Sequence, residues 1–239
     1  MSPELKRRLL DLAAEPYRPT GYFNYRWARG KLRYDPMFTS LLDQRVFPDG
    51  ACVLDLGCGR GLLAAWFLAA ERLAVQGAWS GAVTPPRALR FRGVELIARD
   101  AECGNRALQS VYGDRLELAA GDLRDATIQS ADVVAMLDVL HYVPYPEQDR
   151  LLDRVRAALR PGNLFVTRVG NAGSGLRFRL SQLADGLIML AHGHGLSRMW
   201  CRPAQVWTAA LEARGFGVLA QPMSQGTPFA NVMLVARVI

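Results

Sequence analysis

Residues 53–61 read Val-Leu-Asp-Leu-Gly-Cys-Gly-Arg-Gly, and this stretch decides the fold of the chain. An apolar strand runs directly into three alternating glycines, and the apolar residues 62–68 then open a helix. Glycines leave such a turn without Cβ atoms, and the first N–H groups of the following helix point back at it. The stretch therefore predicts a strand–turn–helix unit of an α/β protein that binds a nucleotide-like ligand.

The spacing of the glycines narrows the choice of ligand. Gly57, Gly59 and Gly61 do not follow the dinucleotide pattern G-x-G-x-x-G, and no Gly-Lys-Ser/Thr follows to make a P-loop. Asp55 lies two residues before the first glycine, where a carboxylate disfavours a pyrophosphate and suits a ligand with an ammonium group. A glycine-rich turn with a capping Asp is the structural alternative.

This stretch resembles the first motif of the class I S-adenosylmethionine (SAM)-dependent methyltransferases, acid-x-Gly-x-Gly-x-Gly, and later segments match that family in order. Glu95, which ends a second strand-like run, matches the acid that holds the ribose hydroxyls. Asp122, with Leu123 beside it, matches the acid near the adenine after the third strand. Asp138 matches the polar residue that ends the fourth strand, and residues 159–166 match the turn before the fifth.

The resemblance implies an α/β, Rossmann-like methyltransferase fold: a seven-stranded, mostly parallel sheet with an antiparallel C-terminal hairpin and helices on both faces. Residues 203–214 are expected to form the last helix, and residues 216–221 and 229–238 the two hairpin strands. SAM is the implied cofactor, and S-adenosylhomocysteine (SAH) is the product. The cofactor-binding residues that the resemblance implies are Asp55, Gly57, Cys58, Gly59, Glu95, Asp122, Leu123 and Asp138.

An N-terminal extension, residues 1–50, precedes this core and is expected to cover the cofactor pocket. Residues 4–14 have the periodicity of an amphipathic helix. Residues 17–34 hold six aromatic side chains among five basic ones, and a basic residue of such an extension can meet the methionine carboxylate in this family. Arg33, or alternatively Arg26, is expected in that role.

The remaining residues, 51–239, are expected to form the SAM-binding domain with two insertions. The first, residues 74–90, reads as a loop and places Glu95 34 residues beyond the last glycine of the turn, where about 20 is usual for the ribose acid. The second, residues 171–201, carries an apolar stripe that predicts a helix at 175–191. Such a helix docks on the core, covers an apolar substrate, or forms a membrane or dimer surface.

His141 is the candidate catalytic base, because it follows the fourth strand at the edge where open α/β sheets carry their sites. SAM brings its own electrophile, so the protein mainly aligns the acceptor and excludes water. An imidazole with a pKa near its ordinary value of about 6.5 suits a phenol, hydroxyl or acid acceptor. Packing beside the adenosyl group is the alternative role of His141, and Tyr142 and Tyr145 are neighbouring alternatives as the base.

A second, less specific resemblance indicates the acceptor. Residues 31–38, 176–179 and 226–231 look like segments of bacterial methyltransferases from polyketide-like and aryl polyene pigment pathways. This resemblance implies an aromatic or acyl acceptor from secondary metabolism, presented on an acidic acyl carrier protein that the basic extension would receive. Methylation on carbon, oxygen or nitrogen stays open. An RNA or protein methyltransferase and a non-catalytic SAM-binding partner protein are the alternative functions.

Composition and charge fit a protein of the reducing cytoplasm. The 239 residues carry a net charge of +7, which suits an acidic protein, nucleic acid or an anionic lipid surface; neither nucleic acid nor membrane is favoured. The N-terminus is charged, and the longest apolar run, residues 62–70, is too short to span a bilayer. The four cysteines are scattered without a C-x-x-C pair, which argues against a disulfide framework and predicts no metal site.

Overall fold

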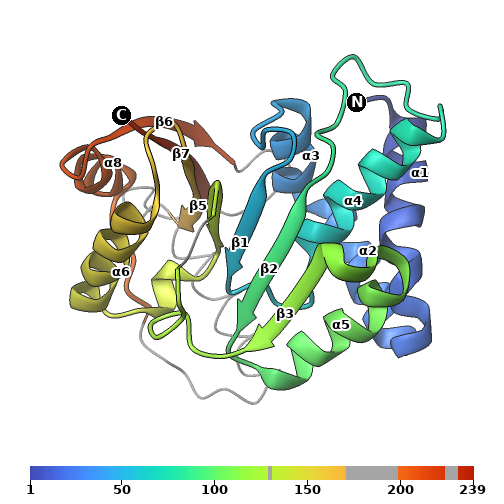
Figure 1. Cartoon of the computed structure of the whole chain (residues 1–239), viewed down its shortest axis with the longest axis horizontal. Helices are drawn as coiled ribbons and strands as arrows, with labels where there is room; N and C mark the ends of the chain where they lie inside the picture. Colours follow the sequence, from blue (N-terminus) through green and yellow to red (C-terminus); the bar gives the residue numbers. More distant parts are fainter. Residues whose placement is uncertain (129–130, 171–198, 224–230) are drawn as a thin grey trace. The chain divides into compact units, whose positions relative to one another are not determined.

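The computed structural model of the chain describes residues 1–128, 131–170, 199–223 and 231–239 (Figure 1). Its internal contacts group into two compact units, Met1–Thr127 and Ile128–Ile239. The division into an extension of 50 residues and a SAM-binding domain stays a prediction.

The first unit is a three-stranded parallel sheet with helices packed around it. β2 pairs with β1 on one side and with β3 on the other, both in parallel. α1 packs on α4, and α5 packs on β3 and on the short helix η1 (Figure 1). The elements are α1 (Pro3–Ala14), η1 (Glu15–Thr20), α2 (Tyr22–Tyr34), α3 (Pro36–Asp43), β1 (Cys52–Leu56), α4 (Leu62–Val75), β2 (Arg90–Glu95), α5 (Ala98–Tyr112), η2 (Gly113–Arg115) and β3 (Leu116–Ala120).

The N-terminal extension covers the apolar helix that follows the glycine turn. Every residue of α4 from Leu62 to Ala70 is buried, so this part of the helix has no polar face for solvent and is covered on all sides. α1 and α3 provide part of that cover. The ring of Phe38 in α3 packs 6.3 Å from that of Trp66 in α4, and Phe47 stacks on Phe67 at 4.6 Å. The extension therefore belongs to the hydrophobic core of the first unit.

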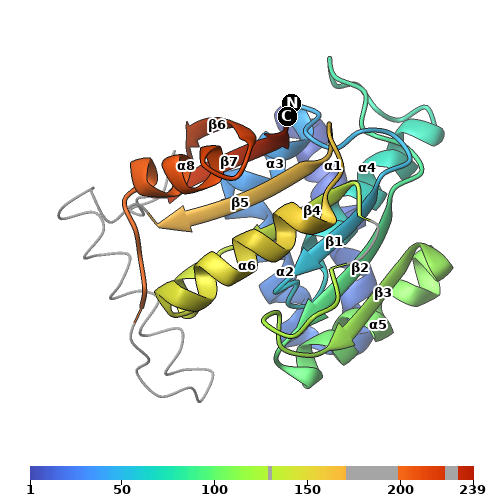
Figure 2. The ribbon, with the colours of Figure 1, turned by 60° about the vertical axis from the view of Figure 1, so that its left-hand side comes forward.

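The second unit combines a parallel strand pair with an antiparallel one. β4 pairs in parallel with β5, β5 pairs antiparallel with β7, and β7 pairs antiparallel with β6. α8 packs on β6 and β7 (Figure 2). The elements are β4 (Val133–Leu137), η3 (Leu140–Tyr142), α6 (Tyr145–Ala158), β5 (Leu164–Gly170), α8 (Ala204–Glu212), β6 (Phe216–Pro222) and β7 (Asn231–Val238). Within the first unit the strand order is β3-β2-β1, and within the second it is β4-β5-β7-β6.

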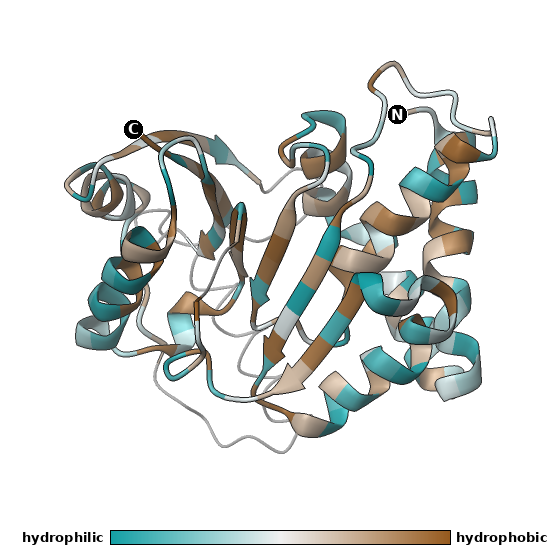
Figure 3. Cartoon of the chain, viewed as in Figure 1, coloured by the Kyte–Doolittle hydropathy of each residue, from teal (hydrophilic) through white to brown (hydrophobic). Residues whose placement is uncertain are grey.

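The strands at the centre of the fold are mostly apolar, as expected for strands that are buried on both faces. β4 and β5 are buried over nearly their whole length. Apolar residues also make up most of β1, which is largely brown in Figure 3, whereas the hydrophilic residues of α6 are teal. Two polar residues interrupt β5. The hydroxyl of Thr167 donates to the carbonyl of Met136 at 2.7 Å, so it is satisfied within the sheet, and Arg168 takes part in the candidate site.

The fold predicted from the sequence is confirmed. The seven strands include an antiparallel C-terminal pair, and the helix expected at residues 203–214 is α8. Within the first predicted insertion, residues 76–89 contain neither helix nor strand. The helix predicted at 175–191 lies outside the described residues, as does most of the second insertion. Of the helices in the described part of the chain, none is both long and apolar enough to cross a membrane.

Candidate functional site

The backbone of the turn between β1 and α4 requires its three glycines. The φ angles are 83° at Gly57, 55° at Gly59 and 76° at Gly61, values that residues with a side chain rarely adopt. A Cβ atom added at Gly61 would lie 3.0 Å from Leu108 and from Leu118, whereas one added at Gly59 would meet no atom within 4 Å. The turn is therefore tightly packed at Gly61 and open at Gly59, where a ligand has room to approach.

The N–H groups of this turn are bonded within the protein. Gly57 and Cys58 donate to the carbonyl of Val94 at 2.7 and 3.2 Å, and Gly59 donates to the Glu95 carboxylate at 2.8 Å. In a dinucleotide site, such amides face the pyrophosphate. Because all three amides already have partners, this turn favours a ligand without phosphate groups.

Glu95 ends β2, and one of its oxygens holds the glycine turn while the other holds the start of the loop that follows β2. Oε2 accepts from the N–H of Gly59, and Oε1 accepts from the N–H of Ile97 at 3.0 Å. A carboxylate oxygen can accept more than one hydrogen bond, so both atoms keep capacity for the hydroxyls of a ligand. The long loop before β2 does not displace Glu95, because Leu56 stays in register with Val94.

Asp55 lies at the carboxyl end of β1, opposite Gly93 in the sheet. Only 6% of the residue is exposed. Burial, together with the negative charge of Glu95, raises the pKa of the Asp55 carboxyl to about 7. A positively charged group bound here would stabilise the ionised form of Asp55, so the site is suited to an ammonium group.

Cys58 turns its side chain into the protein. A Cβ atom added at Gly93 would lie 2.5 Å from the sulfur of Cys58, so the thiol fills the space against β2. Burial raises the pKa of this thiol, with the carboxylates of Asp55 and Glu95 acting in the same direction. The thiol is therefore neutral and unreactive. The contact predicted between Cys58 and the cofactor stays a prediction.

Arg60, between the second and third glycine, ties the turn to its surroundings and was not singled out by the sequence. Only 6% exposed, it donates to Asp100 at 3.0 Å and to Asn24 at 2.8 Å, and its guanidinium lies 4.7 Å from the ring centre of Trp27. The hydroxyl of Tyr17 donates to the carbonyl of Arg60 at 2.7 Å. Three residues of the extension therefore hold the turn in place.

The basic residues predicted to meet the methionine carboxylate lie on exposed parts of α2. The guanidinium of Arg33 lies 5.4 Å from the ring centre of Tyr34, and that of Arg26 lies 6.0 Å from the ring centre of Tyr22. The role predicted for Arg33 stays a prediction.

Asp122 follows β3, next to the strand that Glu95 ends. The N–H of Gly121 donates to the carbonyl of Glu95 at 2.9 Å, which brings the two strand ends together. Hydrogen bonds from Arg124 lower the pKa of Asp122, so this carboxylate is ionised. Asp55, Glu95 and Asp122 thus lie at or just beyond the carboxyl ends of three neighbouring strands of the first unit, and Leu123 directly follows Asp122.

In the second unit, Asp138 has an unusual backbone conformation and a buried partner. Its φ is 62°, and its N–H donates to the carbonyl of Arg168 at 3.2 Å. The guanidinium of Arg168, only 3% exposed, pairs with the Asp138 carboxylate through Nε at 2.7 Å and through Nη2. A lone arginine in the otherwise apolar residues 164–170 signals a buried charge that needs a partner, but it does not identify Asp138 as that partner. The contact predicted between Asp138 and the cofactor stays a prediction.

His141 lies in η3, three residues after Asp138. Its Nε2 atom is buried and has no hydrogen-bond partner among the residues that the structure describes. Burial lowers the pKa of the imidazole, the positive charge of Arg168 lowers it further, and the negative charge of Asp138 opposes both. His141 is therefore neutral at neutral pH and able to accept a proton.

The two tyrosines predicted as alternatives to His141 are partly exposed. The ring centres of His141 and Tyr142 lie 4.1 Å apart, and the hydroxyl of Tyr145 donates to the carbonyl of Cys201 at 3.0 Å. Of the side chains in the described ranges, no three His, Cys, Asp or Glu are grouped so that they could hold a metal ion.

Comparison with known proteins gives one family and several relatives. A family model described as a methyltransferase domain matches residues 25–221. The chain is 26% identical over 197 residues to 3-amino-4-hydroxybenzoate 4-O-methyltransferase of Streptomyces cremeus, a match that covers 80% of this chain and 47% of that protein. The chain spans about half the length of the curated relatives it matches.

Solved structures share the fold. Magnesium protoporphyrin IX methyltransferase from Synechocystis PCC 6803, with bound SAH, is 18% identical and has a TM-score of 0.59, with 92% of this chain and 89% of that chain covered. Mitomycin 7-O-methyltransferase is 22% identical and has a TM-score of 0.60, with 89% of this chain and 56% of that chain covered.

Proposed function

The chain belongs to the class I SAM-dependent methyltransferases, and from this premise we propose that it methylates a hydroxyl group of a small aromatic acceptor. The observation that carries this proposal is the buried Nε2 of His141, which is neutral and has no partner among the described residues. A phenolic acceptor must lose its proton on methylation, and this nitrogen is suited to take it. The similarity to a 4-O-methyltransferase of a hydroxybenzoate supports a phenolic acceptor.

Three carboxylates of the first unit would hold the cofactor. Asp55 would pair with the ammonium of the methionine part, Glu95 would accept the ribose hydroxyls through its carboxylate, one oxygen of which also holds the turn, and Asp122 would face the adenine. SAM supplies a methyl group on a sulfonium sulfur, and transfer to the acceptor oxygen breaks that carbon–sulfur bond and leaves SAH. The protein's own contribution is alignment of the acceptor, exclusion of water and removal of the hydroxyl proton by His141.

Presentation of the acceptor on an acidic acyl carrier protein is the second candidate. It is favoured by the exposed outer surface of α2, where Arg26 and Arg33 lie beside Tyr22 and Tyr34. Such a surface complements an acidic partner. In this version of the proposal the enzyme acts in secondary metabolism on a tethered aromatic or acyl intermediate.

Cofactor binding is tested by thermal unfolding with and without ligand. SAM or SAH at about 100 times its dissociation constant should stabilise the protein by about 2.7 kcal/mol, because it binds only the folded state. The midpoint of unfolding is followed at rising ligand concentration. Asp49→Asn, which changes an exposed carboxylate outside the site, is the control and should keep the full response. No change at millimolar SAM or SAH would contradict the assignment of the cofactor.

The acceptor and the base are tested together by transfer of a labelled methyl group. Hydroxybenzoates with an adjacent amino group, a carrier-bound aryl group and bulk RNA are compared as acceptors. His141→Gln should lower kcat on a phenolic acceptor by about 100-fold or more, since general bases contribute that much, and should leave the thermal response to SAH intact. An unchanged kcat would rule out His141 as the base, and labelling of RNA alone would rule out the small acceptor.

A further inference from the structure

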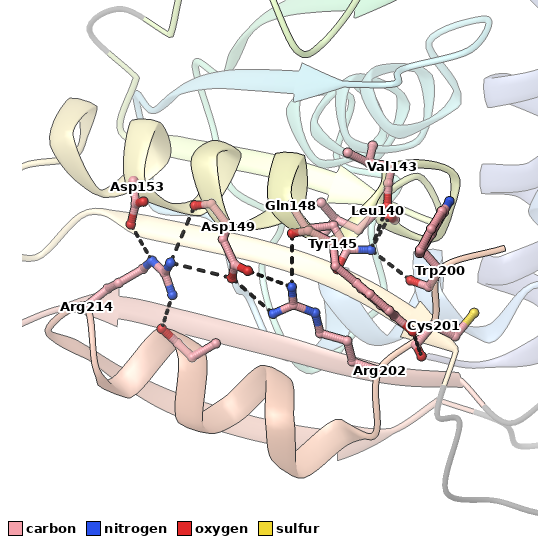
Figure 4. Close-up of polar contacts among 11 residues, drawn as sticks. Leu140, Val143, Tyr145, Gln148, Asp149, Asp153, Trp200, Cys201, Arg202 and Arg214 are labelled. Carbon is pink, nitrogen blue, oxygen red and sulfur yellow. Dashed lines mark hydrogen bonds and ion pairs between the residues drawn. The ribbon is translucent and has the colours of Figure 1, made fainter. Parts of the chain in front are cut away.

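The buried side chain of Gln148 gathers the backbone around His141. Gln148 lies in α6, is fully buried, and its Nε2 faces the carbonyls of Leu140, Val143 and Trp200 at 2.9, 2.9 and 2.8 Å (Figure 4). Leu140 and Val143 flank His141 and Tyr142, so the amide spans the turn that carries the candidate base. Three carbonyls around one amide fix its orientation, because the opposite orientation would set oxygen against oxygen.

The third carbonyl comes from a segment far along the chain that is itself bound to the turn. The N–H of Trp200 donates to the carbonyl of His141 at 2.8 Å, and the ring centres of Trp200 and Tyr145 lie 5.1 Å apart. Trp200 therefore contacts the turn through its N–H and Gln148 through its carbonyl. The side chain of Gln148 therefore contacts both the turn and the segment at Trp200.

An arginine next to this segment anchors it to α6. Arg202 pairs with Asp149 through two nitrogens at 3.0 and 2.8 Å and donates to the carbonyl of Tyr145 at 3.1 Å (Figure 4). Its guanidinium also lies 5.2 Å from the ring centre of Trp207. The segment is thus held by Arg202 independently of Gln148, so that loss of the Gln148 amide should loosen the turn without releasing the segment from α6.

Burying the amide of Gln148 costs free energy, which indicates that this side chain does more than fill space in the core. Its Oε1 is buried and has no hydrogen-bond partner in the described part of the chain, which costs free energy. An apolar side chain of similar length would avoid this cost but would remove the amide hydrogens that Gln148 presents to the carbonyls of Leu140, Val143 and Trp200. The donors, and therefore the geometry of the turn, are what the glutamine supplies.

We propose that Gln148 is a positioning residue, which fixes the turn at Leu140–Val143 against Trp200 so that the imidazole of His141 is held in one orientation toward the acceptor. This inference rests on the proposed function, in which His141 takes the proton of the acceptor. Held backbone carbonyls on both sides of His141 limit its movement, and small misplacements of a base lower the rate of proton transfer sharply.

The test replaces Gln148 by Met, which keeps the length of the side chain and removes its donors. Gln109→Met is the matched control, because Gln109 lies on the exposed side of α5, in the first unit. Nuclear magnetic resonance follows the titration of the His141 ring, which is assigned by comparison with His141→Gln among the three histidines of the chain. The kcat for methyl transfer, its pH profile and the dissociation constant of SAH are measured in parallel.

In Gln148→Met the pKa of His141 should rise toward its ordinary value, because the loosened turn admits water while Asp138 and Arg168 stay in place. The value of kcat should fall by about tenfold or more, the acidic limb of its pH profile should move with the His141 titration, and SAH affinity should not change. Gln109→Met should resemble the unaltered protein.

An unchanged His141 titration and kcat in folded Gln148→Met would overturn the proposal and leave Gln148 a purely structural role. If this variant does not fold, Gln148→Asn, which keeps the donors but withdraws them by one methylene, is judged by the same measurements. The magnetic resonance readout needs no acceptor. If the unaltered protein transfers no methyl group, the proposed function fails. The His141 titration still decides whether Gln148 controls the surroundings of the imidazole ring.

Discussion

Replacing Asp55 by Asn is expected to stabilise the ligand-free protein at alkaline pH and to abolish its stabilisation by SAM. The folded protein raises the pKa of Asp55 from 3.8 to about 7, because burial and the charge of Glu95 disfavour the carboxylate. Above pH 7 the folded state therefore holds an unfavourable negative charge. A difference of about three pKa units corresponds to about 4 kcal/mol, and the unpaired amide of Asn reduces the expected gain to about 2–4 kcal/mol.

The sign of the pH dependence distinguishes this cause from a general effect of the substitution. Since the folded-state pKa lies above the unfolded-state value, the folded protein binds the proton more tightly, and its stability falls as pH rises from about 4 to about 7. Asp55→Asn should lack this part of the fall. Urea unfolding at about pH 4.5 and about pH 8 should give similar stabilities for the two proteins at the lower pH and a more stable variant at the higher one.

Ligand binding should show the opposite preference. The ammonium of SAM requires the ionised form of Asp55, so the affinity of the unaltered protein should weaken by up to about tenfold per pH unit below about pH 7. Asp49→Asn, in which an exposed carboxylate with a lowered pKa is lost, should show neither the gain in stability nor the loss of SAM binding. A variant of Asp55 that is less stable at every pH would contradict the account given for this carboxyl.

Alanine at Gly104 is expected to destabilise the protein, although alanine favours a helix. Gly104 lies inside α5, and a Cβ atom there would lie 2.5 Å from Leu118 and 2.7 Å from the carbonyl oxygen of Arg60. That oxygen accepts the hydroxyl of Tyr17 and belongs to the glycine turn, so it is not free to move. Overpacking costs about 1–3 kcal/mol, which outweighs the gain in helix propensity of about 1 kcal/mol.

Alanine at Gly30 is the matched control and should have the opposite effect. Gly30 lies inside α2, and a Cβ atom there would meet no other atom within 4 Å. Only the gain in helix propensity remains, so this variant should be more stable by about 0.5–1 kcal/mol. Urea unfolding measures both, and SAH titration should show weaker binding in Gly104→Ala alone, because only that clash reaches the turn. Equal gains in both variants would contradict the close packing of α5 on the turn.

Much of the first unit could be predicted from local sequence. Alternation of glycines after an apolar strand, and acids at the ends of successive strand-like runs, require no knowledge of the tertiary structure. The position of Glu95 tested this reasoning, because it lies later in the chain than the ribose acid usually does. Pairing of β2 with β1 nonetheless brings the carboxylate of Glu95 to the N–H of Gly59. The order of the strands therefore predicts the position of this carboxylate better than the length of the loop does.

The interactions that hold the site could not be predicted, because they join residues far apart in the chain. Arg60 meets Asn24 and Asp100 across 36 and 40 positions, Arg168 meets Asp138 across 30, and Gln148 meets Trp200 across 52. Each is a polar side chain that meets a partner which its own stretch of sequence does not identify. Burial makes such pairs obligatory, since an unpaired charge or amide inside a protein costs several kcal/mol, but burial itself is a property of the tertiary structure.

By itself, the sequence determined the strand–turn–helix unit and the order of the carboxylates, because backbone conformation and strand ends depend on residue types a few positions apart. The resemblance of this pattern to a known family indicated the class of cofactor. Only the tertiary structure decided that the amides of the turn are bonded to Val94 and Glu95, that burial raises the pKa of Asp55 to about 7, and that His141 keeps a buried nitrogen without a partner in the described residues. The physical reason is that hydrogen bonding and desolvation depend on which side chains folding brings together.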